Sequence, residues 1–154
     1  LDCAIAENFD MYYIDQNGDK QRPYVIHRTS MGCYERTLAW LIEKYAGAFP
    51  MWLAPTQVKL LPVADRHLDY VNEIKKVLEA NGMRVEVDSR SEKIGYKIRE
   101  AQLEKVPYMF IIGDKDIEAN TVSVRHRKDG DLGAMKLDDF IAMAVEEIET
   151  KTIK

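Results

Sequence analysis

The chain has 154 residues, of which 46% are hydrophobic and 31% are charged, and its formal net charge is −4 at pH 7. This length suits one well-packed domain or one domain with part of another attached. The composition excludes a disordered protein, and the lack of any run of about 18 apolar residues excludes a membrane-spanning helix. The acidic total also excludes a general attraction to nucleic acid, so a site for a polyanion must be a local patch.

The start of the chain, LDCAIAENFD, has neither the basic segment nor the continuous apolar segment of a signal peptide. It also lacks an initiator Met, so we expect the sequence to be a piece of a longer chain. Its two cysteines, Cys3 and Cys33, lack the paired spacing of a disulfide framework or of a thiol zinc site. These features predict a reducing, cytoplasmic location.

Residues 1–49 are expected to form a β-hairpin followed by a helix. The segments MYYID and RPYVIHR flank QNGDK, whose Asn17-Gly18 pair favours the positive φ values of a tight turn. The helix begins near Met31, and Gly47 is placed to end it. Its apolar stripe consists of Tyr34, Leu38, Leu41, Ile42 and Tyr45. Because a hairpin and one helix bury too little apolar surface to stand alone, we expect this segment to join a sheet whose other strands precede residue 1.

The segment FPMWLAP, residues 49–55, predicts a domain boundary because its prolines interrupt regular structure. Strands are expected beyond it at residues 57–63, 83–88, 108–112 and 121–127. Helices are expected from about 66 to 80, from a capping box of Ser89 and Glu92 to about 107, and along the stripe Leu137, Ile141, Ala144 and Ile148. The order βαβαββα predicts a mostly parallel sheet with helices on its faces and one antiparallel hairpin near its end.

Polar side chains are expected to meet at the carboxyl edge of this sheet, where open α/β sheets bind ligands. Those that follow two of the strands are Asp88, Ser89, Arg90, Ser91, Gly113, Asp114, Lys115 and Asp116. The helix SEKIGYKIREAQ adds Gly95, which permits close backbone approach, and Arg99. Alternation in TVSVRHR places Ser123, Arg125 and Arg127 on one face. Such groups suit the base edges of unpaired RNA, although the same charges also fit a solvated rim of ion pairs that each contribute little.

A second candidate site lies in IHRTSMGCYER, residues 26–36. His27 can bind zinc and Arg36 can stabilise a triphosphate. A lone His, however, is more often an ordinary hydrogen-bonded residue, and a lone Arg is more often a partner in a surface ion pair. Neither site can be completed from this sequence. The chain contains no GxxxxGK[ST], GxSxG or HExxH motif, so we expect no self-contained catalysis.

Three stretches, IHRTSMGCYER, FPMWLAPTQV and SEKIGYKIREAQLEKVPYMFIIGDKD, resemble the threonyl-tRNA synthetase family, and the resemblance runs along essentially the whole chain. It implies that residues 1–49 are the end of a class II catalytic domain, a hairpin with the helix of the third signature motif. It implies that residues 50–154 are an anticodon-binding domain, a mixed, mostly parallel five-stranded sheet flanked by helices. The chain is then the C-terminal part of a ligase that joins threonine to tRNA(Thr) through an adenylate made from ATP, and is inactive alone.

The resemblance also implies roles for individual residues. His27 corresponds to the third zinc ligand, whose Cys and His partners lie upstream, and this zinc selects threonine by binding its amino group and hydroxyl. Arg36 corresponds to the catalytic arginine that holds ATP, and Cys33 lies near the amino-acid pocket, where some relatives have Ser. The implied anticodon contacts are Ser91, Arg99, Lys115, Asp116 and Arg125. Asn is common at the position of Ser91 and Glu at the position of Asp116, so both side chains reach less far here.

The implied cofactors are zinc and ATP with magnesium in the full-length enzyme, and none is expected on this portion alone. The implied partners are the anticodon loop of tRNA(Thr) and, for the full-length enzyme, a second copy in a homodimer, with no membrane involved. In the helix SEKIGYKIREAQ, Ile94 and Ile98 are expected to pack on the sheet. Its glycine and its basic residues, including Lys97 and Arg99, are expected to face RNA.

Three other functions fit parts of the sequence. A synthetase of the same subclass, for proline, histidine or glycine, shares the anticodon-domain fold, but His27 and the context NEIKKVLEANGMRVEVD argue against it. A non-enzymatic RNA-binding or accessory module needs no zinc site, and its upstream sequence lacks the Cys and His ligands and the other two class II motifs. A purely structural dimerisation domain predicts no affinity for RNA.

Overall fold

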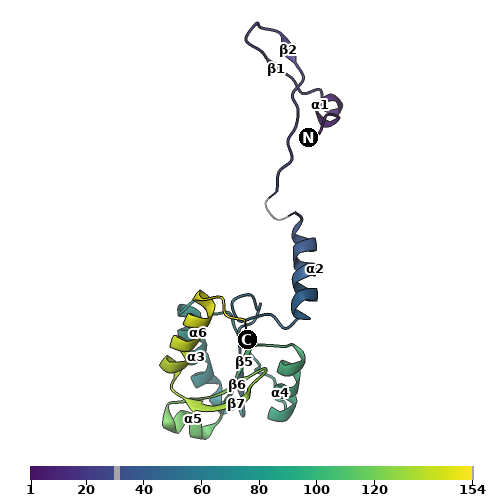
Figure 1. The fold of residues 1–154 in the computed structure, drawn as a ribbon. Coiled ribbons are helices and arrows are strands. Elements are labelled where there is room, and N and C mark those ends of the chain that lie inside the picture. The colour runs from purple at the N-terminus through teal and green to yellow at the C-terminus, as the bar shows by residue number, and fades with distance from the viewer. Residues whose placement is uncertain (30–31, 154) are drawn as a thin grey trace. The chain divides into compact units, whose positions relative to one another are not determined.

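The computed structural model describes residues 1–29 and 32–153, and its chain forms two compact units, Leu1–Trp40 and Leu41–Lys154 (Figure 1). The division falls within the helix α2 (Tyr34–Tyr45), whereas the sequence predicts a domain boundary at residues 49 and 50. The predicted helix start near Met31 lies outside the described residues.

The first unit contains a short helix and a two-stranded antiparallel hairpin. These elements are α1 (Ile5–Asn8), β1 (Tyr13–Ile14) and β2 (Lys20–Gln21). Asp15 holds the turn, because its Oδ1 accepts hydrogen bonds from the backbone N–H groups of Asn17 at 2.9 Å and Asp19 at 3.0 Å. Gly18 has a φ of 86°, which residues with a side chain rarely adopt. The hairpin predicted from Asn17-Gly18 is therefore confirmed.

Apolar side chains of the first unit remain largely uncovered. Ala6 is the one buried residue among the described residues of this unit, and α2 buries none of its side chains. The exposed large apolar residues here include Phe9, Tyr12, Tyr13, Ile14, Tyr24, Ile26, Tyr34, Leu38 and Trp40. A hairpin and a helix of this size bury little surface by themselves, as the sequence predicts.

The second unit is built on a mixed five-stranded sheet of order β4-β3-β5-β6-β7. The strands are β3 (Val58–Pro62), β4 (Val85–Val87), β5 (Tyr108–Ile112), β6 (Val122–His126) and β7 (Gly130–Met135). Strand β3 pairs in parallel with β4 and β5, and antiparallel pairs join β5 to β6 and β6 to β7. The mixed five-stranded sheet is confirmed, but β7 forms where the strand pattern predicts a loop.

The helices of the second unit are the short 3-10 helix η1 (Asp65–His67), α3 (Leu68–Ala80), α4 (Ile94–Leu103), α5 (Asp114–Ala119) and α6 (Leu137–Glu149). Helix α4 begins after Lys93, with no side-chain cap, so the predicted capping box of Ser89 and Glu92 is wrong. An ion pair between Asp88 and Arg90 holds this loop instead. The pattern also missed α5, which is a single short helix between β5 and β6. Among the described residues, no helix combines the length and apolar character that a bilayer crossing needs.

The two faces of the sheet are covered unequally. On one face, Leu60, Phe110 and Val124 pack with residues of α3 and α6 in the main core, where Phe110 and Phe140 meet edge to face with centroids 4.7 Å apart. The other face carries a smaller cluster beneath α4. Its members are Leu61, Ala101 and Met109, with Ile94, Ile98 and Ile111 at its margin. Figure 1 shows α3 and α6 on one side of the sheet and α4 on the other.

Candidate nucleic-acid interface

Helix α4 is fixed to the sheet along one side, which we call the pinned flank and define as Lys97, Glu100 and Glu104. Lys97 is 3% exposed and donates hydrogen bonds of 3.1 Å to the backbone oxygens of Pro62 and Asp88. The expectation that Lys97 faces RNA is therefore wrong. Its ammonium group instead joins α4 to the carboxyl ends of β3 and β4, where it stabilises two backbone oxygens.

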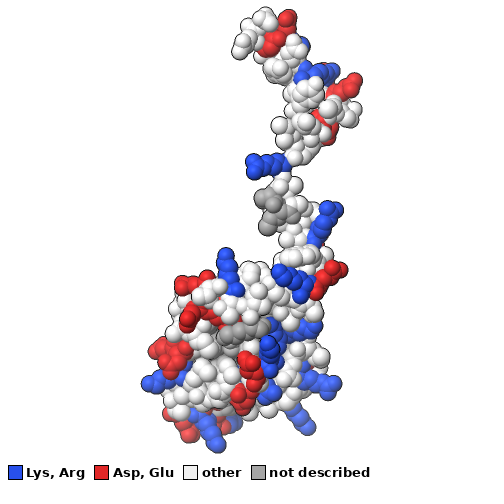
Figure 2. Space-filling view, in the orientation of Figure 1, with Lys and Arg blue, Asp and Glu red and all other residues white. Residues whose placement is uncertain are grey.

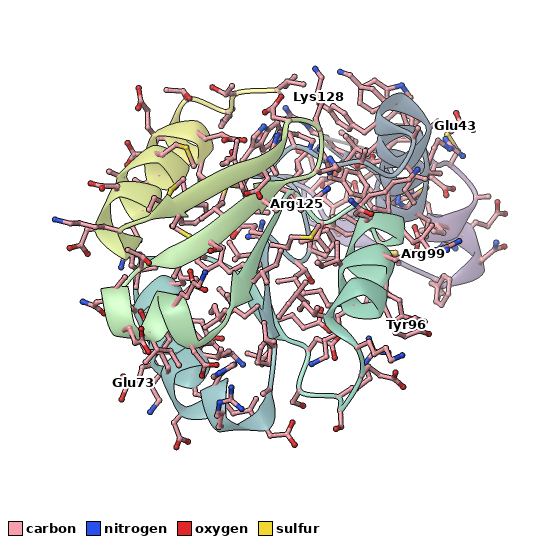
Figure 3. All side chains as sticks on the ribbon, turned by 90° about the horizontal axis from the view of Figure 1, so that it is seen from below. Glu43, Glu73, Tyr96, Arg99, Arg125 and Lys128 are labelled. Atoms are coloured by element: carbon pink, nitrogen blue, oxygen red, sulfur yellow. The ribbon has the colours of Figure 1, made fainter. Side chains whose placement is uncertain are left out.

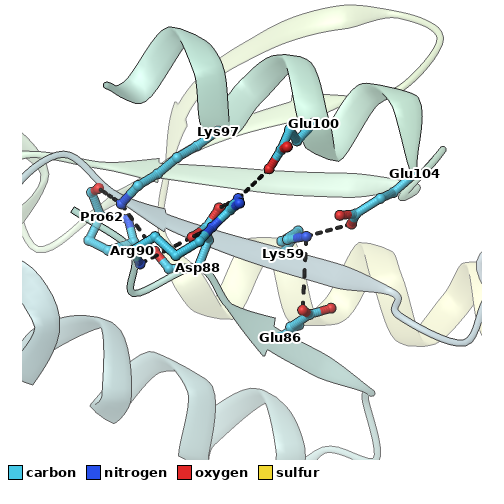
Figure 4. A network of polar contacts seen from close by, with 8 residues as sticks. All are labelled: Lys59, Pro62, Glu86, Asp88, Arg90, Lys97, Glu100 and Glu104. Atoms are coloured by element: carbon cyan, nitrogen blue, oxygen red, sulfur yellow. Dashed lines mark hydrogen bonds and ion pairs between the residues drawn. The ribbon is translucent and has the colours of Figure 1, made fainter. Parts of the chain in front are cut away.

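Two further ion pairs hold the pinned flank (Figure 4). Lys59, buried in β3, lies 2.5 Å from Glu104 and 3.9 Å from Glu86. The guanidinium of Arg90 donates two hydrogen bonds to Asp88, at 2.9 and 2.6 Å, and also pairs with Glu100. These bonds raise the pKa of Arg90, and the hydrogen bond from Arg90 lowers the pKa of Asp88. The guanidinium of Arg90 is thus committed to its own protein.

The opposite side of α4, which we call the open flank, consists of Gly95, Arg99 and Gln102. These residues are spaced by four and three positions and so share one side of the helix. The open flank thus lies on the side of the helix away from the loop that follows β4. All three residues are exposed, and Arg99 has no hydrogen bond or ion pair with any described residue. A Cβ atom built on Gly95 meets nothing within 4 Å, so the backbone here is accessible.

Strand β6 presents polar side chains on the face that α4 only partly covers. Ser123 and Arg125 are half-buried and alternate with fully buried residues of the main core. Arg125 lies opposite Met109 on β5 and opposite Asp131 on β7. Residues 130–135 are exposed or half-buried, so none of the described helices buries this part of the sheet face. Arg125 makes no hydrogen bond or ion pair within the described part of the chain.

Arg99 is thus exposed on α4, and Arg125 is half-buried on β6, on the face of the sheet that α4 partly covers. Figure 3 shows both residues from below, with α4 beside the sheet that carries Arg125. In the second unit, the surface on the α4 side shows more Lys and Arg than Asp and Glu, whereas the side of α3 and α6 shows mostly Asp and Glu (Figure 2). A local basic area thus exists on a chain whose net charge is −4.

Helix α5, which follows β5 directly, contributes both exposed and fixed groups. Lys115 is exposed, and among the described residues it has no ion-pair partner. Asp116 is 8% exposed: its Oδ2 accepts the Gly113 N–H at 3.0 Å and its Oδ1 accepts the Ser123 hydroxyl at 2.7 Å. Asp114 turns away and binds Arg66, whose hydrogen bonds lower the pKa of that carboxyl. Asp114 and Asp116, two of the carboxylates predicted at this edge, therefore already have protein partners.

Two more residues predicted near this edge lie in different settings. Ser91 is exposed in the loop that precedes α4, with no side-chain hydrogen bond to a described residue. Arg127 donates hydrogen bonds to the backbone oxygens of Phe49 at 3.0 Å and Lys105 at 2.6 Å, and burial lowers its pKa. The sheet alternation puts Arg127 on the predicted face, but these bonds give its guanidinium a structural role.

The candidate residues of the first unit do not form a complete site. His27 is exposed, with its Nε2 3.3 Å from a carboxylate oxygen of Asp2. Cys33 and Arg36 are exposed as well. Within residues 1–29 and 32–153, no group of three or more His, Cys, Asp or Glu side chains could hold a metal ion. One imidazole beside one carboxylate is too small a set for a tetrahedral zinc site, so such a site needs ligands beyond those of the described residues.

A family model described as an anticodon-binding domain matches residues 57–147. The chain belongs to the anticodon-binding domain family. Over 151 residues it is 60% identical to the threonine–tRNA ligase of Clostridium botulinum (strain Eklund 17B / Type B), and equally to that of Acetivibrio thermocellus. Each alignment covers 98% of this chain and 24% of the relative, so the chain spans about a quarter of the length of these ligases.

A solved structure agrees with this assignment of an anticodon-binding domain. It is the crystal structure of the RNA-binding domain of threonyl-tRNA synthetase from Cryptosporidium parvum Iowa II, with a TM-score of 0.71 and 29% sequence identity. The alignment covers 94% of this chain and 37% of that chain. The resemblance to threonyl-tRNA synthetase drawn from the three sequence stretches is confirmed by these relatives.

In this anticodon-binding domain, sequence reasoning missed the two buried lysines, Lys59 and Lys97. In each case the position of the lysine in the sequence indicates its burial. Lys59 interrupts the apolar run of β3, and Lys97 lies on the same side of α4 as Ile94 and Ala101. A charged residue at an inward position indicates a fixed partner, because Lys is almost never fully buried unless it is paired.

Proposed function

We propose that this chain recognises the anticodon loop of tRNA(Thr) as the C-terminal part of a threonine–tRNA ligase. That enzyme attaches threonine to tRNA(Thr) through an adenylate made from ATP. The ligases that are 60% identical carry this activity in their names, and the chain spans 24% of their length. Residues 50–154 bind the anticodon, and residues 1–49 belong to the catalytic domain. The chain is inactive alone, and the full-length enzyme is a cytoplasmic homodimer.

The lack of a protein partner for Arg99 on α4 and for Arg125 on β6, among the described residues, carries the proposal. Each guanidinium offers several N–H donors in a planar fork and has no competing partner among the described residues. Unpaired bases of RNA display acceptor and donor edges that such forks can bind. A solvated rim of ion pairs, the other interpretation of these charges, accounts for Arg66 and Arg90. It does not account for two arginines without ion pairs.

The remaining anticodon residues complete the interface in different ways. Lys115 supplies a positive charge for a phosphate or a base, and Ser91 offers a hydroxyl in the loop just before α4. Asp116 lies in α5, with both of its oxygens already accepting hydrogen bonds. We therefore assign direct base contacts mainly to Arg99 and Arg125, which extend from different elements and can bind neighbouring bases.

The catalytic chemistry belongs to the full-length enzyme, where zinc and ATP with magnesium act. We assign His27 to the zinc, Arg36 to ATP and Cys33 to the amino-acid pocket on the resemblance alone. The zinc, when bound, orients threonine through its amino group and hydroxyl. The donor set in this chain does not fit zinc by itself, so we expect no tight zinc binding by the chain alone. Titration with zinc, followed by competition with a chelator, measures this.

The proposal is tested by titrating the chain with RNA stem-loops at a fixed salt concentration, since such affinities depend strongly on salt. We expect the threonine anticodon loop to bind more tightly than a loop with the same nucleotides in scrambled order. Equal affinity for the two would contradict anticodon recognition. A preference for a proline, histidine or glycine anticodon would instead assign the chain to a ligase for that amino acid.

A further inference from the structure

The hydroxyl group of Ser123 has a fixed hydrogen-bond direction. Asp116 accepts the backbone N–H of Gly113 on Oδ2 at 3.0 Å, and its Oδ1 lies 2.7 Å from the Ser123 oxygen. A carboxylate has no hydrogen to donate, so the Ser123 hydroxyl must donate its single hydrogen to Asp116. The Ser123 oxygen is left with lone pairs and no hydrogen for another partner.

This oxygen lies on the face of the sheet that α4 partly covers, the face that also carries Arg125. The two residues are two positions apart on β6, which places them about 7 Å apart on the same face. Across the strand, Ser123 lies opposite Ala134, whose small side chain covers little of the space above β7. Among the described residues, the Ser123 side chain makes no second hydrogen bond. The face thus presents the Ser123 oxygen, which can only accept a hydrogen bond, next to the Arg125 guanidinium, which can only donate one.

We propose that Ser123 is a specificity-determining residue whose oxygen accepts a hydrogen bond from an N–H group of an unpaired RNA base, next to the base bound by Arg125. The inference rests on the proposed function, because it names a further contact at the same interface. Asp116 is the positioning residue that makes Ser123 an acceptor. The site favours a base that offers an N–H at this place and disfavours one that offers a lone pair, since two acceptors facing each other leave both without a hydrogen bond.

The direction of the Ser123 hydroxyl can be reversed without changing its position. In Asp116→Asn, the amide NH₂ cannot face the Gly113 N–H, because both groups donate. The amide oxygen therefore turns to Gly113, and the NH₂ group donates to the Ser123 oxygen. The Ser123 hydrogen is then released to point away from residue 116. Ser123 becomes a donor toward the RNA, and its base preference is expected to invert.

The experiment uses base changes that invert hydrogen-bond polarity and keep shape. Replacing uracil by cytosine, or inosine by adenine at a guanine position, exchanges a ring N–H donor for an acceptor and a carbonyl for an amino group. Each position of the threonine anticodon is exchanged in turn in a stem-loop, and Kd is measured for the native chain and for Ser123→Ala, Ser123→Thr and Asp116→Asn. Circular dichroism and thermal unfolding check that each variant is folded.

We expect one of these base exchanges to weaken binding by the native chain about tenfold, which corresponds to one well-placed hydrogen bond. Ser123→Ala removes this discrimination, Ser123→Thr keeps it because the hydroxyl remains, and Asp116→Asn reverses it at the same position. If Asp116→Asn weakens all stem-loops equally, or all variants keep the native pattern, the inference is wrong while anticodon recognition stands. If the native chain binds every loop equally, the proposed function itself fails.

Discussion

The two flanks of α4 show how one helix can be both held and available. The pinned flank places its charged groups against fixed partners, with Lys97 bound to two backbone oxygens and Glu100 bound to Arg90. The open flank places Gly95 and Arg99 against no described residue. The pinned flank fixes the rotation of the helix about its axis, and this rotation decides where Arg99 points. Preorganisation of this kind lowers the entropy cost of ordering side chains when RNA binds.

The largest expected effect breaks the pinned flank. Lys97→Met leaves the backbone oxygens of Pro62 and Asp88 buried without a charged donor, so we expect the free energy of unfolding to fall by about 2–3 kcal/mol. The matched control is Arg99→Met on the open flank, which should change stability by less than about 0.5 kcal/mol. Urea unfolding measures both. Similar small losses for the two variants would show that the flanks do not differ.

The next effect concerns RNA binding alone. Arg125→Ala is expected to weaken binding of the threonine anticodon loop by about 1–3 kcal/mol if the guanidinium reads a base. The control Lys76→Ala removes an exposed cation of α3, on the far face of the sheet, and should leave affinity unchanged. A loss of the same size for every RNA sequence would identify Arg125 as a phosphate contact. No loss would remove it from the interface.

Acid tests the anchoring of the pinned flank, because Arg90 binds both Glu100 of that flank and Asp88. The pKa of Asp88 is lowered in the folded chain by its hydrogen bonds with Arg90. A group with a depressed folded-state pKa contributes stability that is complete above its unfolded value, about 3.9, and that is lost as the pH falls toward the folded value. We therefore expect the free energy of unfolding to decrease below about pH 4.

Asp88→Asn should flatten this decrease, because it removes the titrating group, at the cost of lower stability at pH 7. The control is Glu118→Gln, which changes an exposed carboxyl of α5 that has no side-chain partner among the described residues. Urea unfolding at several pH values compares the three chains. An unchanged slope in Asp88→Asn would show that the Asp88–Arg90 pair does not govern acid stability.

Strands could be predicted from the sequence where the order of apolar and polar side chains reflects which faces are buried. The apolar run of β5 and the alternation of β6 identify these strands because one or both faces of each are buried. Strand β7, GDLGAM, has two glycines and no buried alternation, so no side-chain signal exists. It forms because its backbone pairs with β6, which already lies in the sheet. The pattern therefore failed where the strand depends on its neighbour.

The interface shows the same limit. Helical spacing and strand alternation were sufficient to place Arg99 and Arg125 on exposed faces. They could not place Lys97, because its partners are backbone oxygens 35 and 9 residues away along the chain. They also could not show that Asp116 turns inward, because that depends on one hydroxyl of a later strand. Side chains that face solvent follow local periodicity, whereas buried polar groups follow partners distant in sequence.

The smallest expected effect sharpens the contrast at Gly95. Ala at this position should raise the free energy of unfolding by about 0.5–1 kcal/mol, because Gly is costly inside a helix and the added methyl meets nothing within 4 Å. On the open flank, the same methyl lies where RNA approaches the backbone, so affinity should fall by about 1 kcal/mol, a typical cost of overpacking. Thermal unfolding and stem-loop titration measure the two quantities. Loss of folding cannot produce a chain that is more stable and binds more weakly, so this outcome would place RNA against α4. Unchanged affinity would confine the contact to β6 and its neighbouring loop.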